Sequence, residues 1–188
     1  MASIINASSS GAGGLISTGD SSGSLQLQSN GVTVATIAAS GVNAGIQMGA
    51  AFAPAFSAYS TTLTSASNAT WTKVTFNTEE FDTNSNFASN RFTPTVAGYY
   101  QVNVCISGPS STTGIIAVNI YKNGASFKIG NAISNITVGT YVVAAALIYC
   151  NGSTDYIEAY AIQSTGGTAN VGSNSVEFGF SASMVRSA

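Results

Sequence analysis

From Phe52 onward, turn residues divide the sequence into short strand-like runs, and this division limits the fold more than any other feature. Turn signals such as Gly108-Pro109, Asn123-Gly124 and Asn151-Gly152 separate the runs. No apolar repeat of about 3.6 residues extends over the length of a helix. The pattern therefore predicts an all-β sandwich or barrel. The expected strands are 55–60, 70–76, 97–107, 115–122, 137–149, 155–163 and 175–185.

The scarcity of charge excludes several classes of partner. Charged residues make up 6% of the chain, against about a quarter of an average soluble domain, so Ser, Thr and Asn side chains must keep the protein in solution. The five Lys and Arg residues are scattered and form no basic stripe, so we expect no nucleic-acid partner. No apolar run approaches the roughly 18 residues that cross a bilayer, so we expect no membrane partner.

The chain contains no histidine, which removes the commonest general base and metal ligand. A Ser-His-Asp or Cys-His arrangement is therefore impossible. Cys105 and Cys150 fall inside expected strands without neighbouring cations, which favours packed, reduced thiols over activated nucleophiles. We expect no catalytic residue, no enzymatic activity and no cofactor.

The densest group of carboxylates is Glu79, Glu80 and Asp82, in an expected loop after Phe76. Oxygen ligands this close together can hold Ca²⁺, so these three residues are the candidate ligands. A solvated acidic loop that keeps a nearly neutral surface soluble is the favoured interpretation. The sequence therefore predicts no metal site.

Residues 1–50 differ from the rest in holding no aromatic residue and a single charge, Asp20. Such a segment cannot offset its own ordering entropy, so we interpret it as an extended Gly/Ser-rich arm ahead of a head at 51–188. Two strand-like runs, 24–28 and 32–38, flank a hairpin signal at Ser29-Asn30-Gly31. The arm is either a flexible leader or a segment that adds strands to a neighbour. In the second case the anchoring side chains are Leu25, Leu27, Val32, Val34 and Ile37.

The run Thr140–Tyr149 is apolar on both faces of the expected strand. One face of an antiparallel sheet normally meets water, so two apolar faces indicate a second cover. That cover is either another part of the chain or a second subunit, and the small alanines suit close approach of a subunit. The candidate subunit-interface residues are Tyr141, Val142, Ala144, Ala146 and Ile148.

Residues 71–104 carry an ordered signature of aromatic, proline and glycine positions. Its members are Trp71, Phe76, Asn77, Asp82, Phe87, Phe92, Pro94, Ala97-Gly98-Tyr99-Tyr100, Val102 and Val104. This signature resembles the complement-type globular heads of the tumour necrosis factor superfamily. The segments 120–124, 155–158 and 176–180 look like that family's central hairpin and its last two strands. The resemblance implies a ten-strand jelly-roll sandwich that packs as a homotrimer.

The arm sequence GLISTGDSSGSLQLQSNGVTVATIAASGV is similar to segments near the N-termini of structural proteins of tailed bacteriophages. Together, the two resemblances imply a bacteriophage virion structural protein, assembled in the host cytoplasm. We expect a homotrimeric capsid decoration or cement protein whose arm binds capsid or other virion proteins. One alternative is the tip of a short tail or head fibre that binds a receptor on the host surface. A secreted complement-like ligand is less favoured, because Met1–Ile5 lacks the cationic start of a secretory signal.

Overall fold

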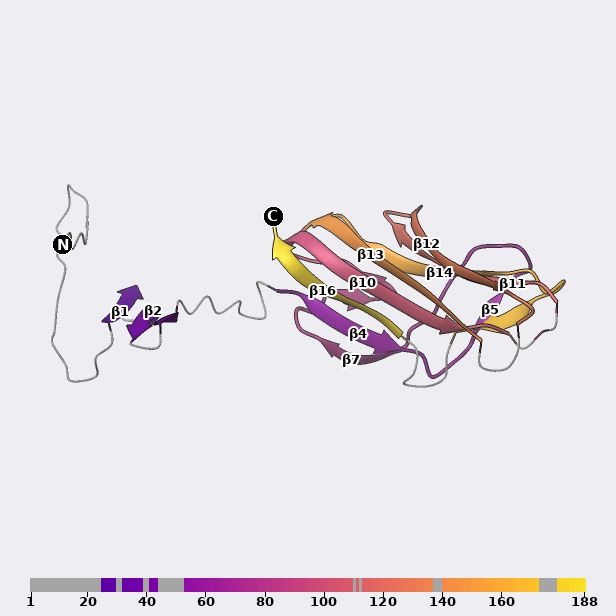
Figure 1. The fold of residues 1–188 in the computed structure, drawn as a ribbon, viewed down its shortest axis with the longest axis horizontal. Helices are drawn as coiled ribbons and strands as arrows, with labels where there is room; N and C mark the ends of the chain where they lie inside the picture. The colour runs from indigo at the N-terminus through magenta and orange to yellow at the C-terminus, as the bar shows by residue number, and fades with distance from the viewer. Residues whose placement is uncertain are drawn as a thin grey trace. The chain divides into compact units, whose positions relative to one another are not determined.

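The computed structural model describes the backbone of residues 25–29, 32–38 and 41–43, and residues 53–109, 111, 113–136, 140–172 and 179–188 in full. All regular elements in these ranges are β-strands. The chain divides into two units, Met1–Gln47 and Met48–Ala188 (Figure 1).

The first unit contains an antiparallel sheet in the order β1-β2-β3, made of β1 (Leu25–Ser29), β2 (Val32–Ala38) and β3 (Gly41–Asn43). The predicted pairing of the two arm strands is confirmed, because Leu25 lies opposite Ile37 and Ser29 opposite Val32. The turn at Asn30-Gly31 lies outside the described residues.

The second unit, the head, is a sandwich of two antiparallel sheets with two shorter strands at one end (Figure 1). The first sheet has the order β13 (Tyr141–Asn151), β10 (Ala97–Ser107), β16 (Gly179–Ser187), β4 (Ala55–Tyr59), β7 (Thr78–Asp82). The second has the order β12 (Ala125–Ser134), β11 (Ile115–Lys122), β14 (Ile157–Gln163), β9 (Arg91–Phe92), β8 (Phe87–Ala88), with β6 (Thr72–Lys73) also paired to β14. The short strands are β5 (Thr64–Ala66) and β15 (Ala169–Val171).

The expected strands 97–107 and 115–122 are confirmed residue for residue as β10 and β11. Two other expectations, one of a strand and one of a loop, were wrong. The strand expected at 70–76 is only Thr72–Lys73, and the loop expected at 79–82 is the edge strand β7. The ten residues of β12 were not among the expected strands, although the resemblance implied a hairpin at 120–124.

Aromatic side chains of the signature meet in the core between the sheets. Phe56 stacks on both Phe87 and Phe92 with 4.6 Å between ring centroids, and Phe180 contacts Phe56 edge to face. Tyr100 packs against Phe92 and donates its hydroxyl to the Val96 carbonyl at 2.7 Å. The buried hydroxyl is therefore satisfied, and the burial raises the pKa of Tyr100.

One side of the sandwich is closed by β12, which approaches β13 of the other sheet. The Val143 amide donates to Asn131 Oδ1 at 2.6 Å. A Cβ on Gly130 would lie 2.0 Å from the Val143 carbonyl oxygen, so only glycine allows the two backbones to come this close. The turn that starts β12 is the predicted Asn123-Gly124, with positive φ at both residues (53° and 77°), as a tight hairpin requires.

The start of β4 and the end of β16 lie at the same end of the head (Figure 1). The Met184 amide donates to the Pro54 carbonyl at 3.0 Å, and the Ala188 amide donates to the Ala97 carbonyl at 3.1 Å. Loops at the opposite end include residues 60–63, 67–70 and 164–168.

Candidate subunit interface

The outward face of the first sheet carries a group of exposed apolar side chains. On β10 and β13, buried and accessible residues alternate, so every second residue points away from the core. The exposed apolar residues that result, together with Val185 of β16, form what we call the apolar patch: Tyr99, Tyr141, Val143, Leu147, Tyr149 and Val185. Other exposed apolar residues, among them Leu63, Phe127 and Ile129, lie on other elements. The patch is the group that the adjacent strands β13, β10 and β16 share, which makes it the candidate interaction surface.

The register of β10 and β13 brings the patch residues together. Tyr99 lies directly opposite Tyr149, and their ring centroids are 5.5 Å apart. Leu147 lies opposite Gln101, next along the strands. The Lys122 ammonium lies 5.8 Å from the centre of the Tyr149 ring. The tyrosines are thus held in place within the chain and present a defined surface.

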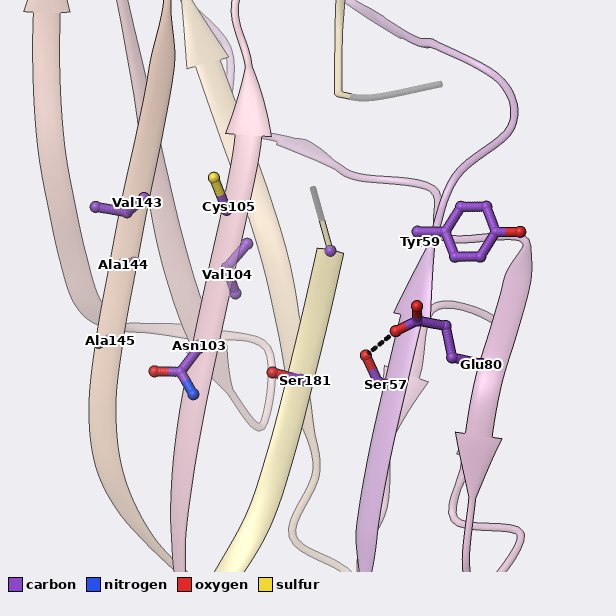
Figure 2. Close-up of a pocket in the computed structure, with 11 residues that line it drawn as sticks. Ser57, Tyr59, Glu80, Asn103, Val104, Cys105, Val143, Ala144, Ala145 and Ser181 are labelled. Carbon is purple, nitrogen blue, oxygen red and sulfur yellow. Dashed lines mark hydrogen bonds between the residues drawn. The ribbon is translucent and has the colours of Figure 1, made fainter. Parts of the chain in front are cut away.

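Two hollows lie on the same face. The first, of about 360 Å³, runs across β4, β7, β10, β13 and β16 and includes Ser57, Glu80, Asn103 and Cys105 among its lining residues (Figure 2). The second, of about 570 Å³, lies beside the C-terminus between Tyr99, Leu147, Val185 and Arg186. The face is therefore uneven, and its shape allows a complementary surface to interlock with it.

The predicted interface residues need a correction. Val142, Ala144, Ala146 and Ile148 point into the core of their own chain and are at most 7% exposed, so a second subunit cannot contact them. Tyr141 is the member of the predicted set that lies on the exposed face. The chain's own core covers one face of β13, and the face that stays exposed and is available to a partner is the one on which Leu147 and Tyr149 lie.

The three candidate metal ligands do not converge. Glu79 and Glu80 are adjacent residues of β7, and the Asp82 carboxylate accepts hydrogen bonds from the Asn84 and Phe87 amides at 3.3 and 2.7 Å. Among the described residues, no three His, Cys, Asp or Glu side chains are grouped to hold a metal ion. Asp82 instead stabilises the turn between β7 and β8.

The cysteines are both free thiols and lie on opposite faces of the first sheet. Cys150 is buried, and burial raises its pKa to about 11. Burial also raises the pKa of Cys105. Raised pKa values disfavour the thiolate, so neither residue has the character of an activated nucleophile.

The five predicted anchoring residues of the arm lie on β1 and β2. Leu25 is opposite Ile37 and Val32 is opposite Ser29, while the register shifts between Leu27 and Gln28, with Ala35 opposite Leu27 and Thr33 opposite Gln28. At this shift Val34 of β2 is the extra residue, with no residue of β1 directly opposite it.

A buried carboxylate organises the outward side of the second sheet. Glu158 Oε1 accepts from Lys73 Nζ at 2.8 Å and from Arg91 Nε at 2.9 Å, and the Tyr160 hydroxyl lies 3.4 Å from Oε2. Burial alone would raise the pKa of Glu158, but the hydrogen bonds and charges of Lys73 and Arg91 outweigh it, and the net pKa is lowered. This network ties β14 to β6 and β9.

We expect Glu158→Gln to lower the free energy of unfolding by about 1–3 kcal/mol at pH 7, because it removes the charge that two cations bind. A carboxyl whose pKa is lowered by folding stabilises the protein above its unfolded pKa and loses that contribution as the pH falls. The difference between wild type and variant in urea denaturation should therefore shrink from about pH 5 toward pH 3. Glu79→Gln, at an exposed position, is the control. A difference that is the same at both pH values would contradict this role of Glu158.

Nowhere in the described part of the chain is there a helix long and apolar enough to span a membrane.

No protein-family model matches the sequence, and no curated protein matches it. Solved structures do resemble the head. The globular domain of zebrafish complement 1qA protein is 17% identical with a TM-score of 0.56, over 72% of this chain and 98% of that one. Eiger TNF from S. frugiperda is 14% identical with a TM-score of 0.51, over 72% and 93%. PRD1 vertex protein P5 is 17% identical with a TM-score of 0.52, over 71% and 96%. The expected fold is thereby confirmed: the head is a jelly roll of the tumour-necrosis-factor type.

Proposed function

We propose that this protein is a non-enzymatic structural subunit of a bacteriophage particle, in which three heads associate through the apolar patch and the arms attach the trimer to the capsid. The observation that carries the proposal is the apolar patch itself, on a head whose fold is shared with a viral vertex protein. Capsid decoration is the specific role that we favour.

The trimer is supported by the character of the patch and by the resemblance of the head. Six large apolar side chains, each at least 41% exposed, lie on one sheet face, and covering them is favourable in free energy. Copies of one chain associate with closed symmetry, and a closed assembly covers the patch on every subunit. The complement and tumour necrosis factor resemblance in the sequence implies three copies.

Attachment by the arm is supported by the arm's composition and its few strands. Its described strands form a three-stranded sheet in a segment without aromatic residues, so it can bury little apolar area as an independent unit. A segment that cannot form its own core is suited to ordering on a partner by strand addition, with backbone hydrogen bonds supplying most of the attachment. Such attachment resists salt, because the arm holds a single charge to be screened.

Deletion of residues 1–47 is expected to leave a folded trimer that no longer attaches to capsids, because the head keeps its core and its patch. Co-sedimentation with undecorated capsids, across a salt series, measures attachment. Full-length protein should bind with little dependence on salt, and the truncated head should stay in the supernatant. Equal binding by both proteins would contradict anchoring by the arm, as would binding of full-length protein that modest salt abolishes.

A fibre tip that binds a host receptor is the second candidate. Exposed aromatic residues in the loops far from the arm would favour it, because aromatic side chains dominate binding hot spots. The loops 60–63, 67–70 and 164–168 are made of Ser, Thr, Asn, Gly and Ala with Leu63, and hold no aromatic or charged residue. These described loops give no support to receptor binding, so decoration stays the role that we favour.

A further inference from the structure

Within the described residues of the head, the outward face of the first sheet carries two charged side chains, Glu80 and Arg186, and neither takes part in an ion pair. In the described part of the head, Lys73 and Arg91 pair with Glu158, and Lys122 pairs with Asp155. Glu80 and Arg186, which line the two hollows, are in none of these pairs.

A bulge turns Glu80 to this face. Ser57 of β4 lies opposite Phe81, Ala58 lies opposite Glu79, and Glu80 is the extra residue between them. Phe81 and Glu80 therefore share the outward side, as residues at a bulge do. The Ser57 hydroxyl donates to Glu80 Oε2 at 2.6 Å, which holds the carboxylate over the first hollow (Figure 2).

A second register shift sets the position of Arg186. Tyr99 lies opposite Arg186 and Tyr100 lies opposite Met184, so Val185 is the extra residue. Arg186 accordingly shares the outward side with Tyr99 and lies among apolar patch residues at the second hollow. The two charges thus occupy distinct sites of one face, Glu80 on the edge strand β7 and Arg186 at the end of β16.

We propose that in the homotrimer Arg186 of one subunit forms an ion pair with Glu80 of the next, so that the second hollow and its apolar rim pack against the first hollow of the neighbour. The inference rests on the proposed trimer. A ring built from two different sites has one such pair at each interface. Covering either charge at an interface without a partner costs free energy, whereas an ion pair gives each charge its partner. The pair also determines which part of one subunit's face contacts which part of the next subunit's face.

Charge reversal tests the pairing. Glu80→Arg and Arg186→Glu, each alone, put like charges at every interface and are expected to weaken the trimer by on the order of tenfold or more in dissociation constant. The double variant Glu80→Arg/Arg186→Glu restores opposite charges and is expected to recover the trimer. Light scattering after size exclusion, over a dilution series, measures both. Glu79→Arg and Lys128→Glu change the net charge equally at exposed positions off the outward face, because Glu79 lies opposite the core-facing Ala58 and Lys128 lies on β12, and they should leave the trimer unchanged.

Mixing the two single variants adds a test of ring size. Alternating the variants satisfies every interface only in an even-numbered ring, so in a trimer at least one interface keeps like charges. The mixture is therefore expected to recover less assembly than the double variant. Full recovery by mixing would indicate a dimer or tetramer and overturn the proposal as stated.

The outcomes separate this inference from the proposed function. A wild-type head that remains monomeric at micromolar concentration overturns the trimer itself. A wild-type trimer that neither single variant weakens, or that both weaken without rescue in the double variant, overturns the pairing alone. Circular dichroism of each variant shows that a loss of assembly is not a loss of fold.

Discussion

Leu147→Asp is expected to convert the trimer into a folded monomer. Leu147 is 56% exposed in the isolated head, so a carboxylate there meets water and costs the subunit little stability. In the trimer the same carboxylate would be covered by an apolar surface without a partner, at a cost of several kcal/mol per interface, roughly. Sedimentation velocity should show the monomer at concentrations where wild type is trimeric, with the melting profile of a folded protein.

Leu63→Asp is the matched control for this change. Leu63 lies in the loop 60–63, between β4 and β5, and is 47% exposed, so the substitution is the same in chemistry and close in exposure but lies outside the patch. Its trimer should persist. If both variants dissociate, or neither does, the apolar patch is not the subunit interface.

Gly130→Val is expected to destabilise the head by about 3 kcal/mol or more. The new Cβ would lie 2.0 Å from the Val143 carbonyl oxygen and 2.8 Å from the Ala144 Cβ. Because one of these atoms is backbone, no change of side-chain rotamer relieves the clash, and β12 must move away from β13. Urea denaturation measures the loss of free energy, and hydrogen exchange should show loss of protection in β12.

Gly167→Val is the control for Gly130, since a Cβ at Gly167 would meet no atom within 4 Å. Its stability should stay within about 0.5 kcal/mol of wild type. A Gly130→Val head as stable as wild type, with β12 still protected, would show that the close approach of the two strands does not hold the sandwich closed.

Sequence patterns located the strands whose two faces differ or whose ends carry turn residues. β10 alternates between core and surface residues and has Gly98 as its second residue, and β11 ends directly before Asn123-Gly124, so both were predicted with correct ends. The signature residues Phe87, Phe92 and Tyr100 were recognisable because they share one core. β12 was missed, because its residues are exposed on both faces over most of its length and show no alternation.

Four of the five predicted interface residues lie on the core face of β13, for a related reason. Alternation separates Leu147 from Ile148, but when both faces are apolar it does not tell which one the chain's own second sheet covers. That choice depends on the register of β13 with β10 and on the packing of the other sheet. The placement of Glu80 and Arg186 was equally out of reach, because each depends on a bulge that no local residue pattern specifies.

The start of β4 and the end of β16 lie at the same end of the head, and this placement determines where foreign sequences can be displayed. A peptide fused after Ala188 leaves the head at the end where β4 begins, because Met184, near the end of β16, lies beside Pro54. In the proposed assembly the chain runs from this end to the arm, so the fused peptide would compete for space with the capsid. An epitope inserted between Gly166 and Gly167, where added side-chain atoms at either residue meet nothing within 4 Å, would instead project from the opposite end. Engineered display on this scaffold should accordingly use that loop rather than the C-terminus.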